Sequence, residues 1–217
     1  MKLILARHGN TFNAGEPVVM AGLTNDVPLV TKGMEQADAV GKALKHAGIT
    51  PAAVYCSTLQ RTRQFAEIVC ATLGLPLEPQ PDARLDELDY GAWTGLTDAE
   101  IDAMPFGAEA RENWQKKSIW PSHAQWNPTP EKVIADVKSF AADMTQRHGD
   151  AAAVLAVTSN GRLRYFLHLY PGAWEKHHAA GNVKVGTGHL CVLDESDDNW
   201  EIEAWNVAPH ALQVESQ

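Results

Sequence analysis

An arginine and a histidine stand side by side where an apolar strand is expected to end. Residues 3–11 read Leu-Ile-Leu-Ala-Arg-His-Gly-Asn-Thr, so Arg7 and His8 directly follow four apolar residues. In open α/β sheets ligands gather beyond the carboxyl ends of the strands, and a histidine placed there faces a crevice instead of the core. The guanidinium of Arg7 can form a forked pair of hydrogen bonds with a phosphate, and Gly9 lets a ligand approach the backbone closely. Without a second signal, the tripeptide is equally compatible with a capping arginine and a surface histidine.

A second cationic side chain follows a later apolar segment. Residues 55–63 read Tyr-Cys-Ser-Thr-Leu-Gln-Arg-Thr-Arg, a predicted strand that gives way to a helix with Arg61 in its first turns. The N-terminus of a helix offers unpaired N–H groups and a favourable dipole to an anion. Arg61 is therefore a candidate anion ligand, and the alternative is an exposed helix arginine.

A run of acidic residues supplies candidates for proton transfer. Residues 85–95 read Leu-Asp-Glu-Leu-Asp-Tyr-Gly-Ala-Trp-Thr-Gly and contain Asp86, Glu87 and Asp89. A carboxyl group can act as a general acid when burial beside other acids keeps it protonated part of the time. The alternative is an acidic surface turn whose carboxylates are solvated.

These motifs, in this order, resemble those of the histidine phosphatase superfamily, which is phosphoglycerate mutase-like. That family pairs Arg-His-Gly after its first strand with a Ser-x-Leu-x-Arg-[Ala/Thr] turn after a later strand. Residues 26–37 read Asp-Val-Pro-Leu-Val-Thr-Lys-Gly-Met-Glu-Gln-Ala and are similar to the family's Pro-Leu-Thr-x-x-Gly-x-x-Gln-Ala stretch. Residues 85–95 resemble its Leu-x-Glu-x-x-[Phe/Tyr]-Gly-x-Trp-x-Gly segment. Several ordered motifs spread over most of the chain are far more specific than one.

The resemblance implies a reaction and assigns four side chains to it. His8 would attack the phosphorus atom, while Arg7 and Arg61 would hold the equatorial oxygens. Glu87 would protonate the leaving alcohol and then help to activate the water that hydrolyses the phosphohistidine. The expected activity is metal-independent hydrolysis of a phosphate monoester without a cofactor, and no His-x-His, His-Glu-x-x-His or Cys-x-x-Cys arrangement predicts a metal site. Two alternatives are phosphoglycerate mutase-like phosphotransfer and a phospholigand-binding protein with weakened catalysis.

The main departure of the chain from the family pattern follows the predicted strand 152–157. Residues 157–164 read Val-Thr-Ser-Asn-Gly-Arg-Leu-Arg where the family has Val-[Ser/Thr]-His-Gly, so Ser159 stands where a second pocket histidine is expected. That histidine normally contacts the phosphate. We expect the Ser159 hydroxyl and Asn160 to contact the substrate in its place. His189, which follows a Gly-Thr-Gly run, is a further candidate near the site.

The elements that must position these residues alternate along the chain. The predicted strands cover residues 2–6, 53–56, 152–157 and 189–193. The predicted helices cover residues 31–46, 59–73 and 130–147. Thr31 and Thr129 are candidate N-caps, and Gly48 and Gly74 are expected to stop the first two helices. The alternation predicts an α/β three-layer sandwich, with a mostly parallel central sheet, helices on both faces and the phosphoglycerate mutase-like architecture.

Length, composition and charge restrict the class of protein. The 217 residues, 45% hydrophobic and 21% charged, fit a single domain over residues 1–217 and contain no apolar run long enough to cross a membrane. The formal charge of −9 argues against a nucleic-acid partner, because phosphate backbones attract basic surfaces. We expect a small phosphorylated substrate, no membrane partner and a cytoplasmic location, and the sequence predicts no oligomeric state. The cytoplasmic prediction follows from the short apolar run at the N-terminus and from Cys56, Cys70 and Cys191, interpreted as reduced, buried thiols.

One segment breaks the alternation of strands and helices. Residues 104–129 contain three tryptophans and three prolines with little periodicity, so they are predicted to leave the core as an excursion. This segment is either a lid over the active site that sets substrate choice or a packed surface loop whose tryptophans bury area.

Overall fold

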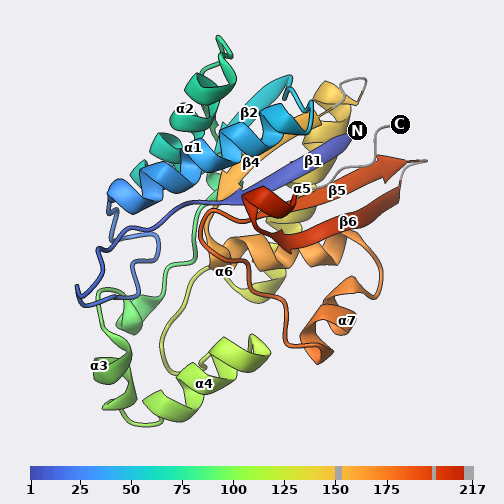
Figure 1. The fold of residues 1–217 in the computed structure, drawn as a ribbon. Helices are drawn as coiled ribbons and strands as arrows, with labels where there is room; N and C mark the ends of the chain where they lie inside the picture. Colours follow the sequence, from blue (N-terminus) through green and yellow to red (C-terminus); the bar gives the residue numbers. More distant parts are fainter. Residues whose placement is uncertain (150–152, 197–198, 213–217) are drawn as a thin grey trace.

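A six-stranded mixed sheet forms the centre of the computed structural model, which describes residues 1–149, 153–196 and 199–212 (Figure 1). The strands are β1 (Lys2–Arg7), β2 (Ala53–Cys56), β3 (Gln80–Pro81), β4 (Ala153–Thr158), β5 (Leu190–Ser196) and β6 (Asn199–Val207). Their order across the sheet is β3-β2-β4-β1-β5-β6. The pairs β2–β3, β2–β4 and β1–β4 are parallel, whereas β5 runs antiparallel to β1 and to β6. The predicted α/β fold with a mostly parallel sheet is confirmed, and an antiparallel pair completes one edge.

Helices cover both faces of this sheet (Figure 1). The helices are α1 (Thr31–His46), α2 (Gln60–Leu73), α3 (Asp98–Asp102), α4 (Gly107–Lys117), α5 (Pro130–His148), α6 (Asn160–Leu163) and α7 (Ala173–Ala179). Short 3-10 turns are η1 (Ala83–Leu85), η2 (Gly91–Trp93), η3 (Arg164–Leu169) and η4 (Pro209–Ala211). Successive residues of β1 point to opposite faces. Ile4 therefore packs in a cluster with residues of α1 and α2, while Leu3 packs in a cluster with Phe140 of α5, which gives the three predicted layers.

Local sequence signals place the main helix boundaries to within about one residue. Gly74 ends α2 in the left-handed conformation, with φ of 70°, and the Thr129 hydroxyl accepts a hydrogen bond from Lys132 N at the start of α5. Thr31 does not cap α1, because the helix already begins at Thr31 and its N-cap position is Val30, which makes no side-chain cap. The last strand predicted from the sequence begins at Leu190 instead of His189, and Ala152, the first residue of the predicted third strand, lies outside the described residues.

The segment 104–129 contains a helix that the sequence pattern did not predict. Helix α4 lies with α3 at the lower edge of the view, away from the central sheet (Figure 1). Trp114 of α4 is 2% exposed and packs against Trp126 with ring centroids 4.7 Å apart. Trp126 in turn packs 4.7 Å from the ring of Tyr90. The tryptophans therefore anchor this segment on the hydrophobic core by burying aromatic area.

The parallel strands bring several predicted site residues to one edge of the sheet. Arg7 is paired with Thr158 in the β1–β4 register, and His8 N donates a hydrogen bond to Thr158 O at 3.0 Å. Ser57 N likewise donates to Val157 O at 3.2 Å, just beyond the end of β2. The segments that follow β1, β2 and β4 consequently start side by side, as ligand-binding segments of open α/β sheets do.

Two expectations about the whole chain have structural counterparts. The three cysteines are free and buried, and burial raises the pKa of the Cys56 thiol to about 11. Among the described residues, we find no helix with the length and apolar character needed to cross a bilayer.

Candidate active site

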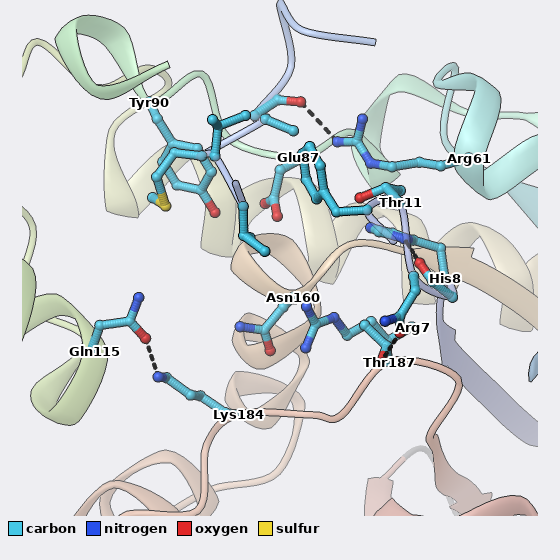
Figure 2. A pocket seen from close by; sticks show the side chains of 18 of the residues that line it. Arg7, His8, Thr11, Arg61, Glu87, Tyr90, Gln115, Asn160, Lys184 and Thr187 are labelled. Atoms are coloured by element: carbon cyan, nitrogen blue, oxygen red, sulfur yellow. Dashed lines mark hydrogen bonds between the residues drawn. The ribbon is translucent and has the colours of Figure 1, made fainter. Parts of the chain in front are cut away.

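A cavity of about 400 Å³ opens beyond the carboxyl ends of β1, β2 and β4 (Figure 2). The structure brings five of the six predicted site residues to its wall: Arg7, His8, Arg61, Glu87 and Asn160. They come from four segments that are far apart in the sequence. In Figure 2, His8 and Arg61 lie on one side of the cavity, with Glu87 beside them.

His8 is held as a neutral imidazole with one nitrogen prepared for attack. The side chain is 7% exposed, and its Nδ1 lies 2.7 Å from the carbonyl oxygen of Gly9. A carbonyl oxygen can only accept, so Nδ1 carries the proton and Nε2 keeps its lone pair. Burial and the positive charges of Arg61 and Arg7 hold the pKa of His8 well below its ordinary value of 6.5. His8 therefore has the tautomer and the charge state that a nucleophile requires.

Two glycines allow the loop after β1 to pack closely against the start of α1. A Cβ atom at Gly9 would lie 2.4 Å from Gly33 O, and a Cβ atom at Gly33 would lie 2.2 Å from Asn10 O. Neither distance is possible for a real side chain, so both positions require glycine. This backbone contact explains physically why the Arg-His-Gly run and the 26–37 stretch each contain a glycine at the point where they meet.

Gln36 of α1 fixes the same loop from a second direction. Its Oε1 accepts a hydrogen bond from Asn10 N at 2.8 Å, and its Nε2 donates to Thr187 O at 3.2 Å. The Thr187 hydroxyl also donates to Asn10 Oδ1 at 2.8 Å. Gln36 therefore ties the segment after β1 to the segment before β5, and both segments contribute to the cavity wall.

Arg7 and Arg61 each have one buried nitrogen without a hydrogen-bond acceptor among the described residues, although Arg61 Nη1 lies 4.0 Å from Asp26 Oδ1. Arg7 Nη1 donates to Val185 O at 2.6 Å, and Arg61 Nη2 donates to Gly22 O at 2.8 Å. Within the described part of the chain, Arg7 Nε and Arg61 Nη1 have no hydrogen-bond acceptor. An unsatisfied buried donor costs free energy of about 1–3 kcal/mol, more when it is charged. The oxygens of an anion bound beside His8 would remove this penalty.

The turn before α2 explains how the sequence aims Arg61 at the cavity. The hydroxyls of Ser57 and Thr62 lie 2.7 Å apart, and Thr62 Oγ1 also donates to Leu59 O at 2.9 Å. These contacts close the turn around the first residues of α2, where Arg61 stands at the second position. The serine and threonine of the Ser-x-Leu-x-Arg-Thr motif thus fix the turn that orients Arg61.

Of the three neighbouring acids, Glu87 is the one that lines the cavity. It is 6% exposed; its Oε2 accepts from Gly161 N at 3.0 Å and its Oε1 from Arg162 N at 3.1 Å. Asp86 instead accepts from Thr58 N at 2.8 Å, and Asp89 accepts from Gly91 N at 2.9 Å. The geometry therefore separates one carboxyl group in the cavity from two that stabilise turns.

Ser159 follows β4 directly, next to His8 at the same edge of the sheet. The side chain is 0% exposed, and its hydroxyl has no hydrogen-bond partner among the described residues. Asn160 reaches the cavity wall, and its Oδ1 accepts from Val185 N at 3.0 Å. His189 turns its ring toward Asn206, with Nδ1 2.9 Å from Asn206 Oδ1.

Sequence reasoning assigned no role to several further residues of the cavity wall, notably Arg164, Lys184, Gln115 and Tyr90. Arg164 is 1% exposed; its guanidinium lies 4.1 Å above the centre of the Trp114 ring. Arg164 and Tyr90 belong to segments that resembled family motifs, so a signal existed for both. Lys184 and Gln115 stand in no such motif.

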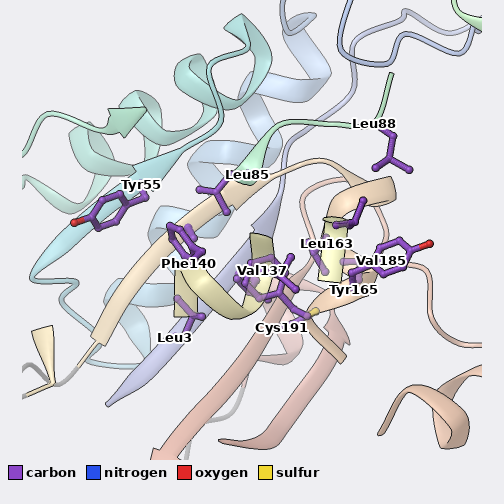
Figure 3. Packing of buried hydrophobic residues seen from close by; sticks show 14 of the residues in the cluster. Leu3, Tyr55, Leu85, Leu88, Val137, Phe140, Leu163, Tyr165, Val185 and Cys191 are labelled. Carbon is purple, nitrogen blue, oxygen red and sulfur yellow. The ribbon is translucent and has the colours of Figure 1, made fainter. Parts of the chain in front are cut away.

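Hydrophobic neighbours hold these polar groups in place (Figure 3). Leu85 and Leu88 flank the segment of Glu87, and Leu163 and Tyr165 flank Arg164; all four are buried in one cluster. Apolar side chains on both sides of a polar residue fix its backbone, because moving it would expose them. The cavity is therefore built on core segments.

Within residues 1–149, 153–196 and 199–212, no cluster of three or more His, Cys, Asp or Glu side chains has the arrangement of a metal site.

Comparison with known proteins agrees with the motifs. The family model of the histidine phosphatase superfamily (branch 1) matches residues 3–208. The probable phosphoglycerate mutase GpmB of Salmonella paratyphi B is 33% identical over 218 residues, which cover 95% of this chain and 91% of that protein. The corresponding protein of Salmonella arizonae is 30% identical with the same coverage.

Solved structures show the same similarity. A mycobacterial glucosyl-3-phosphoglycerate phosphatase in complex with VO3 has a TM-score of 0.77 and 26% identity, covering 95% of this chain and 98% of that one. YhfR from Bacillus stearothermophilus has a TM-score of 0.78 and 25% identity, covering 97% of this chain and 99% of that one.

Proposed function

Because the chain belongs to the histidine phosphatase superfamily, we propose that it hydrolyses a small phosphate monoester through a phosphohistidine on His8. The observation that carries this proposal is the state of His8: a neutral imidazole with a free Nε2, beside two arginines that each have one buried nitrogen without a hydrogen-bond acceptor among the described residues. A phosphoryl group placed there would meet a nucleophile and two cationic donors at once. The chemistry needs neither a metal nor a cofactor.

In the first half-reaction the Nε2 lone pair of His8 attacks phosphorus, and the bond from phosphorus to the ester oxygen breaks. The hydrogen bond from Nδ1 to Gly9 O stabilises the positive charge that develops on the ring. Arg7 and Arg61 bind the equatorial oxygens, where negative charge is held in the transition state. Glu87 gives its proton to the departing oxygen, which leaves as an alcohol.

In the second half-reaction a water molecule takes the place of the alcohol. Glu87, now a carboxylate, removes a proton from that water as it attacks phosphorus. The P–N bond breaks, its electrons return to Nε2, and inorganic phosphate leaves. Glu87 ends protonated and His8 neutral, so both residues return to their starting states.

The backbone around Glu87 fixes the position of its carboxyl group. The N–H groups of Gly161, Arg162 and Leu88 donate to its two oxygens. The carboxyl group is therefore held on the wall of the cavity that also contains His8.

We assign Ser159 a supporting role in this site. Its buried hydroxyl, which has no hydrogen-bond partner among the described residues, would supply one neutral donor at the position where the motif resemblance implies a second pocket histidine. A hydroxyl stabilises developing negative charge less than an imidazolium but leaves more room. The segment 104–129 would set substrate choice as a cover of the cavity, since Trp114 and Gln115 line it.

Phosphoryl transfer within one substrate is the second candidate. It is favoured by the similarity to proteins named probable phosphoglycerate mutase, at 30–33% identity over 95% of the chain. The same His8 would receive the phosphoryl group and return it to a second hydroxyl. Isomerisation of phosphoglycerate without phosphate release would favour the mutase, and release of phosphate from a panel of monoesters would favour the phosphatase.

The decisive experiment traps the intermediate. Brief incubation with a 32P-labelled substrate should leave acid-labile, base-stable label on the wild type and none on His8→Ala. Label retained by His8→Ala would exclude His8 as the nucleophile. Absence of both label and turnover over the whole panel would favour a binding protein instead. Prolonged chelation should leave the rate unchanged, and a loss restored by a divalent ion would contradict metal-independent chemistry.

A further inference from the structure

The cavity contains more positive charge than one phosphate group requires. Besides Arg7 and Arg61, its wall includes Arg164 and Lys184. In Figure 2, Lys184 and Gln115 lie on the opposite side of the cavity from His8 and Arg61, with Asn160 between the two groups. A phosphate bound at His8 would therefore leave the Lys184 side free.

Arg164 is a buried cation whose hydrogen-bond and ring contacts in the described part of the chain are with neutral groups. Its Nη1 donates to Ser118 Oγ at 2.9 Å, its Nε donates to Asn160 O at 3.3 Å, and its plane lies over the Trp114 ring. These neutral partners orient the guanidinium but do not neutralise it. Among the described residues no carboxylate comes within ion-pair distance of Arg164, although it is 1% exposed. A buried charge left in this way is costly.

Lys184 is presented to the cavity by a fixed backbone. The adjacent residue Val185 accepts a hydrogen bond from Arg7 Nη1 and donates its N–H to Asn160 Oδ1 at 3.0 Å. The Lys184 ammonium donates to Gln115 Oε1, again a neutral partner. Burial and the nearby charges of Arg164 and Arg7 lower the pKa of Lys184.

The acids of the cavity leave this second group of cations unbalanced. Asp98 is already paired with Arg111, whose Nη1 lies 3.2 Å from its Oδ2. Glu87 is held by three backbone N–H groups beside His8. Among the described residues, Arg164 and Lys184 therefore have no ion-pair partner, although the charges of Glu87 and Asp98 act on them from a longer distance.

We propose that Arg164 and Lys184, with Gln115, form a second anion-binding subsite that recognises an anionic group at the far end of the substrate. The preferred substrates are then phosphate monoesters that carry a second anion, either a carboxylate or another phosphoryl group. This inference rests on the proposed phosphatase function for the orientation of the substrate. The subsite acts in binding, because Lys184 and Gln115 lie across the cavity from His8 (Figure 2).

The test uses non-hydrolysable ligands, so that it does not depend on turnover. A series of straight-chain phosphonates of increasing length, each ending in a carboxylate, is compared by calorimetry with the same series ending in a neutral carboxamide. A third series ends in a second phosphonate and distinguishes the two anion types. At the best length the charged end should improve Kd at least about tenfold over the carboxamide, as expected for charge-assisted hydrogen bonds. Equal affinity of charged and neutral ends at every length would overturn the subsite.

Substitutions test whether Arg164 and Lys184 cause the higher affinity for ligands with a charged end. Lys184→Met should bring the affinity ratio of carboxylate to carboxamide ligands close to one while affinity for the carboxamide changes little, and Lys184→Arg should restore most of the ratio. Arg164→Met should have the same effect, provided that its circular dichroism and melting curve match the wild type. Lys45→Met removes an exposed lysine on α1 and serves as the matched control, with an unchanged ratio. A ratio that survives in Lys184→Met and Arg164→Met would also contradict the proposal.

Turnover of the corresponding phosphate esters separates this inference from the proposed function. Hydrolysis without preference for a charged end would leave the phosphatase assignment standing and remove the subsite. A binding preference for the charged end without any hydrolysis would support the subsite and contradict the phosphatase assignment.

Discussion

The backbone N–H of Gly161 donates to Glu87 Oε2 at 3.0 Å, and a Cβ atom at position 161 would lie 2.3 Å from Glu87 Oε1. The start of α6 therefore touches the carboxyl group that we assign as the proton donor. The same Cβ atom would lie 2.5 Å from the Tyr90 hydroxyl. Glycine at this position keeps the carboxyl group in place, and its replacement tests the site without removing any functional group.

Replacing Gly161 with alanine should displace Glu87 and lower kcat/KM at least about tenfold. The extra methyl group overpacks a buried site, which typically costs 1–3 kcal/mol of stability. Steady-state kinetics and urea denaturation measure both effects. If the loss acts through Glu87, the kcat/KM of the double variant should be only slightly lower than that of Glu87→Gln alone. Fully additive losses would show that Gly161 acts independently of the acid.

Glu87→Gln should harm alkyl phosphates far more than aryl phosphates. An alkoxide is a poor leaving group and needs a proton, whereas an aryl oxide departs without one. We expect a difference of about 10² or more between the two substrate classes, the usual contribution of general acid catalysis. Asp86→Asn and Asp89→Asn, which change the neighbouring acids, should show no such discrimination. Equal losses on both classes would exclude Glu87 as the acid.

Ser159→Ala should lower turnover while leaving the fold as stable as before or slightly more stable. The hydroxyl is buried and has no partner in the described structure, so its removal relieves a desolvation penalty of about 1 kcal/mol or more. One donor aimed at the transition state contributes roughly 3 kcal/mol, so the rate should fall on the order of 10².

Ser57→Ala is the matched control for Ser159, because both serines are 0% exposed but the Ser57 hydroxyl lies 2.7 Å from Thr62 Oγ1. It should lose stability, in contrast to Ser159→Ala. Wild-type turnover in Ser159→Ala would place that serine outside the chemistry. His189→Ala, assayed in parallel, tests whether a histidine has replaced it.

Gln36→Leu should reduce both stability and kcat. It removes the acceptor of Asn10 N and the donor to Thr187 O, and unsatisfied groups of this kind cost about 1–3 kcal/mol. Gln36→Glu keeps an acceptor and should be less damaging than Gln36→Leu. The neighbouring exposed Glu35, changed to alanine, provides the control and should alter stability by less than about 0.5 kcal/mol. Equal kinetic effects of the changes at positions 35 and 36 would contradict the role of Gln36.

His8 should make the protein less stable as the pH falls below 6.5, its ordinary pKa. The unfolded chain takes up a proton on His8 there, whereas the folded chain, with a pKa well below 6.5, does not. The unfolded state thus binds more protons, and the free energy of unfolding decreases with falling pH until the folded pKa is reached.

The comparison with His8→Asn isolates this effect from other titrating groups. Stability relative to the wild type should shift in favour of His8→Asn between about pH 7.5 and about pH 5.5, as measured by urea denaturation. A pH-independent difference would show that His8 titrates alike in both states. The wild-type rate should likewise show no loss from His8 protonation near pH 6.5.

Features encoded by adjacent residues could be predicted from the sequence. An apolar run that stops at Arg7-His8, a Thr-Pro pair at positions 129 and 130 and a glycine at 74 each act within a few residues, so the four predicted strands and three predicted helices begin within about one residue of observed elements. Strands β3 and β6 were not predicted, and the predicted Thr31 cap was wrong. The candidate residues Arg7, His8, Arg61 and Glu87 stand in ordered motifs, and the structure gathers them in one cavity. Helix α4 was missed because its tryptophans and the flanking prolines obscure the helical period.

The tertiary structure alone decided the charge and the extent of the site. His8 is neutral because burial and two arginines from different segments surround it, and no local pattern reports such an environment. The motif resemblance singled out Glu87 from Asp86 and Asp89, and only the structure gives the physical difference: the Glu87 carboxyl group accepts a hydrogen bond from the start of α6. Arg164 and Lys184 share one wall with Gln115 because α4, η3 and the segment before β5 pack together across more than sixty residues of chain. The proximity of these three side chains depends on how the core packs, so it cannot be predicted from the spacing of the residues along the chain.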